Sequence, residues 1–174
     1  MKVGVFVSHF SQYDAMCNDA LEMYRPLVRL GFDAEFFASH VADKRDDVQM
    51  RLLRESDDFL QNPSNLLIFH HGIFEPVFPK VVDAKCRKVL RYHNITESRF
   101  FKGYDEVAVD ICHKGRQQLK GCLDAFEYYW SNSNYSSQEL VEKFEGDASK
   151  CRVLYPFHFV EDRFAAPQSN VDVE

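Results

Sequence analysis

The chain has 174 residues, of which 45% are hydrophobic and 28% charged, and it contains 16 Phe and 8 Tyr. A globular domain of this size buries roughly two thirds of its unfolded surface, and this composition excludes a disordered chain. The formal net charge is -6. Because phosphate contacts require a concentrated excess of Lys and Arg, which is absent, we expect no nucleic-acid partner.

The cysteines and the apolar runs bear on the compartment. Five cysteines are scattered without CxxC spacing, which indicates free thiols in a reducing compartment, so we expect a cytoplasmic protein. The first apolar run stops at Val7, too short for a signal peptide, and no later run approaches the ~20 residues of a membrane span.

The first half of the chain alternates strands and helices. Residues Lys2 to Val7 predict a first strand, and Asp14 is expected to cap a helix that ends at Gly31 and contains Pro26. A second strand is predicted over 32–38. The spacing of apolar residues between Val41 and Leu60 predicts an exposed helix.

The second half continues the alternation, with strands predicted over 66–70, 87–92, 127–131 and 151–155. Between them we expect a loop with a short helix over 72–85, a helix over 103–125, and a helix opened by a capping box of Ser136 and Glu139. Residues 1–160 therefore predict one three-layer α/β/α, Rossmann-like domain with a mostly parallel sheet, and 161–174 a tail or interdomain linker.

Polar side chains follow two of the predicted strands. His93, Asn94 and Thr96 follow the strand 87–92, and His70 and His71 end the strand 66–70. The carboxyl ends of parallel strands form the ligand-binding edge of such a sheet, so the two histidine-bearing ends are expected to face one crevice. From residue chemistry alone, His93 is equally well explained as a binding residue or as a histidine that satisfies loop backbone.

Other candidates have simpler explanations. His70 and His71 point to opposite faces of a strand, so we expect no more than one of them in the crevice. An adjacent pair of histidines also has poor geometry for binding one metal ion, so we expect no metal site. Asp14 and Asn18 share one face of the first helix beside the same crevice, although helix capping is the more ordinary role for Asp14. No Gly-x-Gly-x-x-Gly or Walker motif is present, which disfavours a dinucleotide site.

Several segments occur in the order found in one enzyme family: Asp14-Ala15-x-x-Asn18-Asp19, the strand ending at His70, Arg91-Tyr92-His93-Asn94-Ile95-Thr96 followed by Phe100-Phe101, Ser133 with Tyr135, Gln138-Glu139-Leu140, and Val153-Leu154-Tyr155-Pro156. Together they resemble the amino-terminal domain of GT-B, retaining, nucleotide-sugar glycosyltransferases over nearly all of residues 1–164. The match departs from the family where the first loop lacks a common glycine pair and where Glu97-Ser98-Arg99 replaces a proline-containing run.

The resemblance implies the acceptor side of an interdomain cleft. It implies that His93 approaches the reacting sugar of the donor, and that the loop from His9 to Asp14 lies beneath the donor phosphates or next to the acceptor. The candidate substrate-binding residues are then His9, Asp14, Asn18, His70, Asn94 and Thr96.

The family's paired-glutamate nucleotide-binding region has no counterpart before Glu174. The resemblance therefore implies a chain that is inactive alone and requires a donor-binding domain or subunit. It also implies a nucleotide-sugar co-substrate without a further cofactor, and a glycan or lipid-linked acceptor. A group of basic residues suggests peripheral contact with the inner face of a membrane; it consists of Lys80, Lys85, Arg87, Lys88 and Arg91.

The alternative is a non-enzymatic Rossmann-like binding or regulatory module, because a fold does not fix a function. A free-standing hydrolase or reductase is disfavoured, since neither a Gly-x-Ser-x-Gly elbow nor a nucleotide fingerprint occurs.

Overall fold

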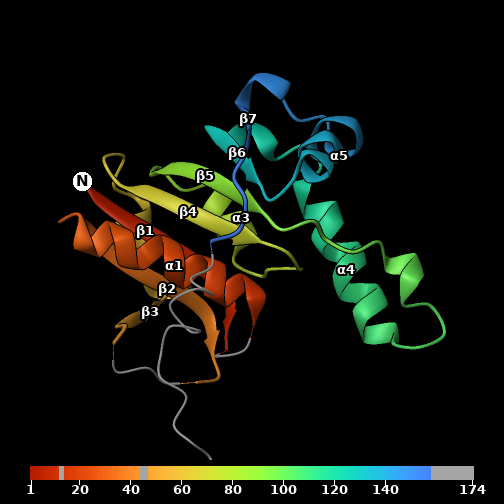
Figure 1. The fold of residues 1–174 in the computed structure, drawn as a ribbon, viewed down its shortest axis with the longest axis horizontal. Coiled ribbons are helices and arrows are strands. Elements are labelled where there is room, and N and C mark those ends of the chain that lie inside the picture. The colour runs from red at the N-terminus through yellow and green to blue at the C-terminus, as the bar shows by residue number, and fades with distance from the viewer. Residues whose placement is uncertain (12–13, 44–46, 158–174) are drawn as a thin grey trace, which may run out of the picture.

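A computed structural model of the chain describes residues 1–11, 14–43 and 47–157. These residues form one seven-stranded sheet with the order β3-β2-β1-β4-β5-β6-β7, in which neighbouring strands pair in parallel (Figure 1). The strands are β1 Lys2–Phe10, β2 Asp33–Val41, β3 Met50–Leu52, β4 Leu66–His71, β5 Arg87–Tyr92, β6 Tyr128–Ser131 and β7 Cys151–Val153. The predicted α/β, Rossmann-like fold is confirmed.

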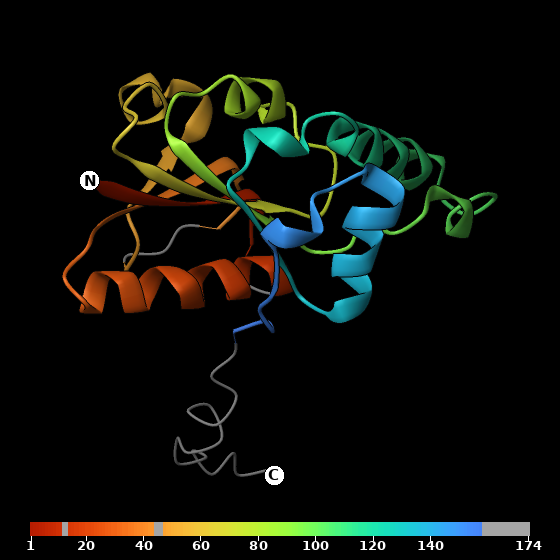
Figure 2. The same ribbon diagram turned by 90° about the horizontal axis from the view of Figure 1, so that it is seen from above.

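Helices cover both faces of the sheet (Figure 2). On one face α1 (Ala15–Arg29) packs over Val5, Phe36 and Ile68. On the other face a second core around Phe69 and Leu90 contains residues of α2 (Asp57–Leu60), α3 (Phe78–Val82), α4 (Glu106–Leu119) and α5 (Asn134–Phe144). Short 3-10 helices, η1 Leu53–Glu55, η2 Ser98–Phe100, η3 Leu123–Ala125 and η4 Ala148–Lys150, complete the connections.

The first helix agrees with the prediction at its start and continues past its proline. The Asp14 carboxylate accepts a hydrogen bond from the backbone N–H of Cys17 at 2.8 Å, which caps α1. Pro26 lies inside α1, which runs on to Arg29 before Gly31 turns the chain at φ +82°. The predicted capping box of α5 is wrong by one turn, because Ser133 is the N-cap and Ser136 lies within the helix.

The helix predicted between Val41 and Leu60 is wrong. Val41 is the last residue of β2, which is longer than predicted because it pairs with β1 as far as Phe10, and Met50–Leu52 forms the edge strand β3 against β2. Only η1 and α2 are helical in the described part of this segment. Pairing with the exposed edge of β2 determined the secondary structure of this segment more strongly than the helical spacing of its apolar residues did.

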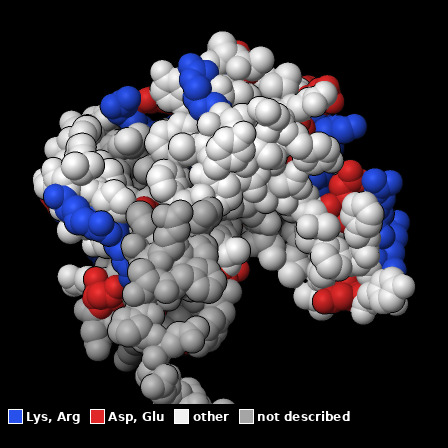
Figure 3. All heavy atoms as spheres, in the orientation of Figure 1, with Lys and Arg blue, Asp and Glu red and all other residues white. Residues whose placement is uncertain are grey.

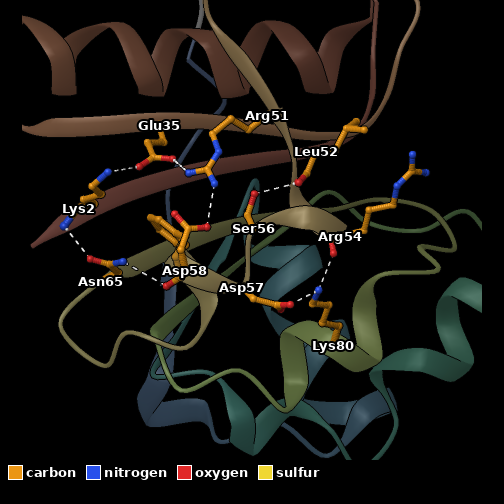
Figure 4. Close-up of polar contacts among 11 residues, drawn as sticks. Lys2, Glu35, Arg51, Leu52, Arg54, Ser56, Asp57, Asp58, Asn65 and Lys80 are labelled. Atoms are coloured by element: carbon orange, nitrogen blue, oxygen red, sulfur yellow. Dashed lines mark hydrogen bonds and ion pairs between the residues drawn. The ribbon is translucent and has the colours of Figure 1, made fainter.

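Charged side chains hold this edge of the sheet together (Figure 4). Glu35 on β2 lies between Lys2 on β1 and Arg51 on β3, and Arg51 also contacts Asp58 on α2 at 2.8 Å. Three strands and a helix are thereby linked through one carboxylate and one guanidinium. Such charges on an edge strand also discourage pairing with another chain.

The segment from η2 through α4 extends away from the sheet and forms an arm (Figures 1 and 2). Its base is held by a close backbone approach, because a Cβ at Gly115 would lie 2.6 Å from the Phe74 nitrogen and 2.9 Å from the Ile73 carbonyl carbon. Arg116 adds a hydrogen bond of 2.7 Å to the Ile95 carbonyl. Gly115 is therefore a packing contact between α4 and the loop after β4.

The predicted linker 161–174 lies outside the described residues. All five cysteines are free thiols. No helix in the described ranges combines the length and the apolar character that crossing a bilayer demands.

Candidate functional site

A cleft of about 460 Å³ opens at the carboxyl edge of the sheet, beside the ends of β1 and β4. Connections from β1 and β4 leave to opposite sides of the sheet, so this is the topological switch point at which α/β proteins bind ligands. The cleft is lined by Ser8, His9, Asp14, Ala15, Met16, Asp19, Gly72, Ile73, His93, Asn132 and Pro156.

Four polar side chains form a buried cluster at the base of the cleft. Asp19 on α1 accepts a hydrogen bond at Oδ2 from Arg91 Nε on β5 at 2.8 Å. Nδ1 of His70 and Nε2 of His93 are 2.9 Å apart, and they lie 3.7 and 3.6 Å from the same Asp19 oxygen. Only His93 reaches solvent, with 13% of its side chain exposed.

Burial makes both imidazoles neutral. Desolvation lowers the pKa of His93 to about 4, against a smaller opposing effect of the Asp19 carboxylate. The pKa of His70 is lowered well below its ordinary value by desolvation and by the adjacent His93 and Arg91. Since Asp19 and Arg91 balance each other, the cluster carries no net charge, and His93 presents a neutral hydrogen-bonding edge to the cleft.

The cluster does not suit a metal ion, although Asp19, His70 and His93 place three ligand atoms within 4.8 Å of one another. Arg91 already donates to the Asp19 oxygen that would bind the ion. A divalent ion would add two positive charges to a buried, neutral group beside a guanidinium, which is electrostatically unfavourable.

The structure brings some of the predicted site residues together. His9, Asp14 and His93 line the cleft, and His70 lies directly behind His93. Asn18, Asn94 and Thr96 do not line the cleft. His71 points to the other face of β4, where its Nε2 lies 3.3 Å from the Gly115 carbonyl oxygen, as the alternation of a strand predicts.

Asn94 turns the chain immediately after His93. It adopts φ +57°, a left-handed conformation that asparagine tolerates better than most residues. Beyond it, the Ile95 N–H donates to the Tyr92 hydroxyl at 3.2 Å, and that hydroxyl donates to Glu139. Glu139 also pairs with Arg116 at 2.8 Å, so a buried network fixes the loop that carries His93.

Gly72 limits the space around His93 from the other side. A Cβ at this position would lie 3.1 Å from the His93 Cβ and 3.2 Å from the Met16 sulfur. The end of β4, the start of α1 and the end of β5 thus meet closely at the cleft.

Asp19 and Arg91 were not predicted as site residues. A signal for them exists in the sequence, because Arg91 stands inside a strand of buried type and Asp19 stands beside apolar positions of the first helix. Charged residues at core positions need each other as partners. The basic cluster suggested for membrane contact is also wrong in part, because Lys88 and Arg91 are buried.

The sequence matches no protein-family model and no curated protein. The fold is similar to solved structures of alpha-glucosyltransferase. In a complex with UDP and a 13-mer DNA containing an HMU base, the similarity covers 91% of this chain and 43% of that one, with 13% identity and a TM-score of 0.54. In a complex with UDP it covers 91% and 44%, with 13% identity and a TM-score of 0.53. The chain thus spans less than half of each enzyme.

These neighbours correct one expectation. The first of them binds DNA, and another holds a 13-mer DNA containing an A:G mismatch, with 12% identity, a TM-score of 0.50 and coverage of 90% of this chain and 41% of that one. The exclusion of a nucleic-acid partner was therefore wrong. Net charge describes a whole chain, whereas a nucleic acid contacts only a local surface.

Proposed function

We propose that this chain is the acceptor-side half of a retaining glycosyltransferase that uses a uridine diphosphate sugar and a nucleic-acid acceptor. The observation that carries the proposal is the cleft at the topological switch point, with the partly exposed His93 backed by a buried, neutral cluster. The similarity in fold to UDP-bound alpha-glucosyltransferases supports the sugar donor, and the DNA in two of those structures supports the acceptor class.

The donor would be held mainly by a second, donor-binding half, which closes over the cleft. In the reaction, the bond between the anomeric carbon and the diphosphate oxygen breaks. A bond from that carbon to an acceptor hydroxyl oxygen forms on the same face of the sugar. The hydroxyl proton passes to the departing diphosphate, so the products are the glycosylated acceptor and a nucleoside diphosphate.

The buried cluster suggests which hydrogen bond His93 offers. Nε2 of His70 is buried without a partner among the described residues, and a buried N–H without a partner is rarer in native structures than a buried acceptor without one. His70 then carries its proton on Nδ1 and donates to Nε2 of His93. His93 in turn carries its proton on Nδ1, on the other edge of the ring, and can donate it to a sugar hydroxyl or to the developing negative charge of the leaving group.

The test combines the chain with a candidate donor-binding half, encoded either downstream or in a neighbouring reading frame, and measures transfer from labelled nucleotide sugars to DNA. Transfer is expected only in the combined sample. His93→Gln should lower kcat by about 100-fold, as expected for the loss of one donor to developing charge. His40→Gln, on the exposed end of β2, should leave kcat unchanged.

Transfer by the chain alone would contradict the proposal of a half-enzyme. Full activity of His93→Gln in the combined sample would remove His93 from the mechanism. Inversion of the anomeric configuration in the product, measured by NMR, would contradict the retaining reaction.

A further inference from the structure

A basic groove lies between η2, α4 and α5, apart from the cleft. It measures about 320 Å³, and its walls carry Arg99, His113, Arg116, Lys120 and Lys143 against a single acid, Glu97. Arg99 pairs with Glu97 at 2.8 Å, and Arg116 pairs with Glu139 at 2.8 Å. Lys120 and Lys143 form no ion pair with any described residue, so the groove keeps an uncompensated positive charge.

Cations at these two positions have an ordinary explanation as well. Lys120 is the C-cap of α4 and Lys143 lies in the last turn of α5, where positive charge stabilises the helix dipole. That explanation applies to each lysine separately. It does not account for the exposed rings beside the groove.

The tip of the arm exposes large apolar side chains. Phe100 is 64% exposed, Tyr104 92% and Val107 70%. Arg99, which lines the groove, places its guanidinium carbon 4.9 Å from the centre of the Phe100 ring, so the aromatic tip and the groove adjoin. Exposed aromatic residues grouped in this way mark an interaction surface.

The arm is a poor candidate for lying in a lipid surface. The apolar face of α4 is already buried in the domain through Cys112, Gly115 and Leu119. Its remaining surface alternates in charge, with Asp110 paired to Lys114 at 2.6 Å, and Figure 3 shows both signs of charge on the arm. An interfacial helix needs a broad free apolar face.

We infer that the groove binds the phosphate backbone of the nucleic-acid acceptor and that Phe100 and Tyr104 stack on its bases. Exposed aromatic rings next to cations are the combination that binds unpaired nucleotides. The inference rests on the proposed function for the acceptor class, and it adds the surface that holds the acceptor. Binding is measurable without sugar transfer, so the two proposals can fail separately.

The test is fluorescence anisotropy of labelled single-stranded and duplex DNA with the full chain over a range of salt concentrations. The variant Lys120→Gln with Lys143→Gln should reduce the slope of log K against log salt by roughly 1.4 to 1.8, for two lost phosphate contacts. The variant Phe100→Ser with Tyr104→Ser should weaken binding by at least about tenfold with the slope unchanged, because stacking is not ionic.

A matched control removes the same charge elsewhere. Arg29→Gln with Lys85→Gln changes two exposed cations that do not line the groove and should leave both affinity and slope as in the wild type. All changed side chains are exposed. Circular dichroism verifies that each variant is folded.

Three results would overturn the inference. The first is no DNA binding by the wild-type chain at low ionic strength. The second is an equal loss of affinity in the groove variant and the control, which would indicate general attraction. The third is binding to vesicles of phosphatidylcholine and phosphatidylserine that depends on Phe100 and Tyr104 while DNA binding does not. DNA binding of the expected pattern, with no sugar transfer in the sample that combines the chain with a donor-binding half, would instead contradict the proposed function.

Discussion

Asp19 Oδ2 and Arg91 Nε are 2.8 Å apart in an ion pair that solvent does not reach, with 1% and 0% of their side chains exposed. On the same strand, Arg87 pairs with Glu127 at the same distance, but both of those side chains are substantially exposed. The two pairs share chemistry and differ in burial. They therefore offer a direct comparison of what burial does to an ion pair.

Arg91→Met should lower the free energy of unfolding by about 3–5 kcal/mol, because it leaves the Asp19 carboxylate buried without its counter-charge. Urea denaturation measures the effect. Adding Asp19→Leu should recover a large part of the loss, since two apolar side chains leave no buried charge. Arg87→Met is the matched control and should change stability far less. Equal losses in the two single variants would contradict this account of the cluster.

Stability should fall as the pH is lowered from 6.5 towards 4. Burial lowers the pKa of His71 from its ordinary value of 6.5 to about 4, and that of His93 likewise. Across this interval the unfolded chain binds more protons than the folded one. The contribution of the two histidines to the free energy of unfolding is therefore complete above pH 6.5 and is lost as the pH falls. Each histidine adds a slope of up to about 1.4 kcal/mol per pH unit.

His71→Phe tests this slope without a change in the cleft. Phenylalanine keeps the contacts of the ring with Phe69 and Phe78, whose centres lie 5.8 and 5.1 Å away. Urea midpoints between pH 4 and 7 should then depend less on pH than in the wild type. His113→Gln, at a histidine that is exposed on α4, is the matched control. An unaltered slope in His71→Phe would be inconsistent with a neutral, buried His71.

Gly115→Ala should destabilise the fold by about 1–3 kcal/mol, because the added methyl group would overlap backbone atoms of Ile73 and Phe74 that cannot move away independently. This expected loss of stability is opposite in sign to the effect of helix propensity, which favours Ala over Gly by about 1 kcal/mol. Gln117→Ala, at an exposed position of the same helix, is the control. Thermal or urea unfolding distinguishes the two, and a stabilised Gly115→Ala would refute the close approach.

Tyr92→Phe should lower the free energy of unfolding by about 1–3 kcal/mol, because it removes the hydroxyl that accepts from the Ile95 N–H at 3.2 Å and donates to Glu139. The same change should speed hydrogen exchange at the Ile95 amide, which NMR detects. Tyr128→Phe on the adjacent strand removes an exposed hydroxyl and should alter neither quantity. Unchanged exchange at Ile95 would argue that the network does not hold the loop after His93.

The strands at the centre of the sheet could be predicted because their determinants are local. Residues 87–92 centre on the apolar pair Val89 and Leu90 and are followed by a polar turn, and the structure places β5 on those residues. Convergence of His70 and His93 followed from parallel pairing alone, since the ends of adjacent parallel strands meet at one edge. β3 could not be found in this way. Its pairing of Met50 with Phe36 is a tertiary contact, and the local spacing around it favours a helix.

The site was predictable only in part, for a similar reason. His9, Asp14 and His93 adjoin turns that the sequence marks, so they could be placed at the cleft. Asp19 lies one residue after Asn18, and the rotation of the helix between them decides which side chain reaches the cluster. Helical periodicity alone does not decide which of two adjacent residues faces the cluster, because helix positions are uncertain by a residue or more. The contact of Asp19 with Arg91 in the structure decides it.

The second oxygen of Asp19 also has a partner, the backbone N–H of Phe157, which donates to Oδ1 at 2.7 Å from a position 138 residues further along the chain. Phe157 is the last residue that the structure describes. The amide proton of Phe157 is consequently a natural spectroscopic reporter of the cluster. Its chemical shift senses any redistribution of charge on the Asp19 carboxylate, so occupancy of the cleft can be followed by NMR without attaching a label to the cleft itself.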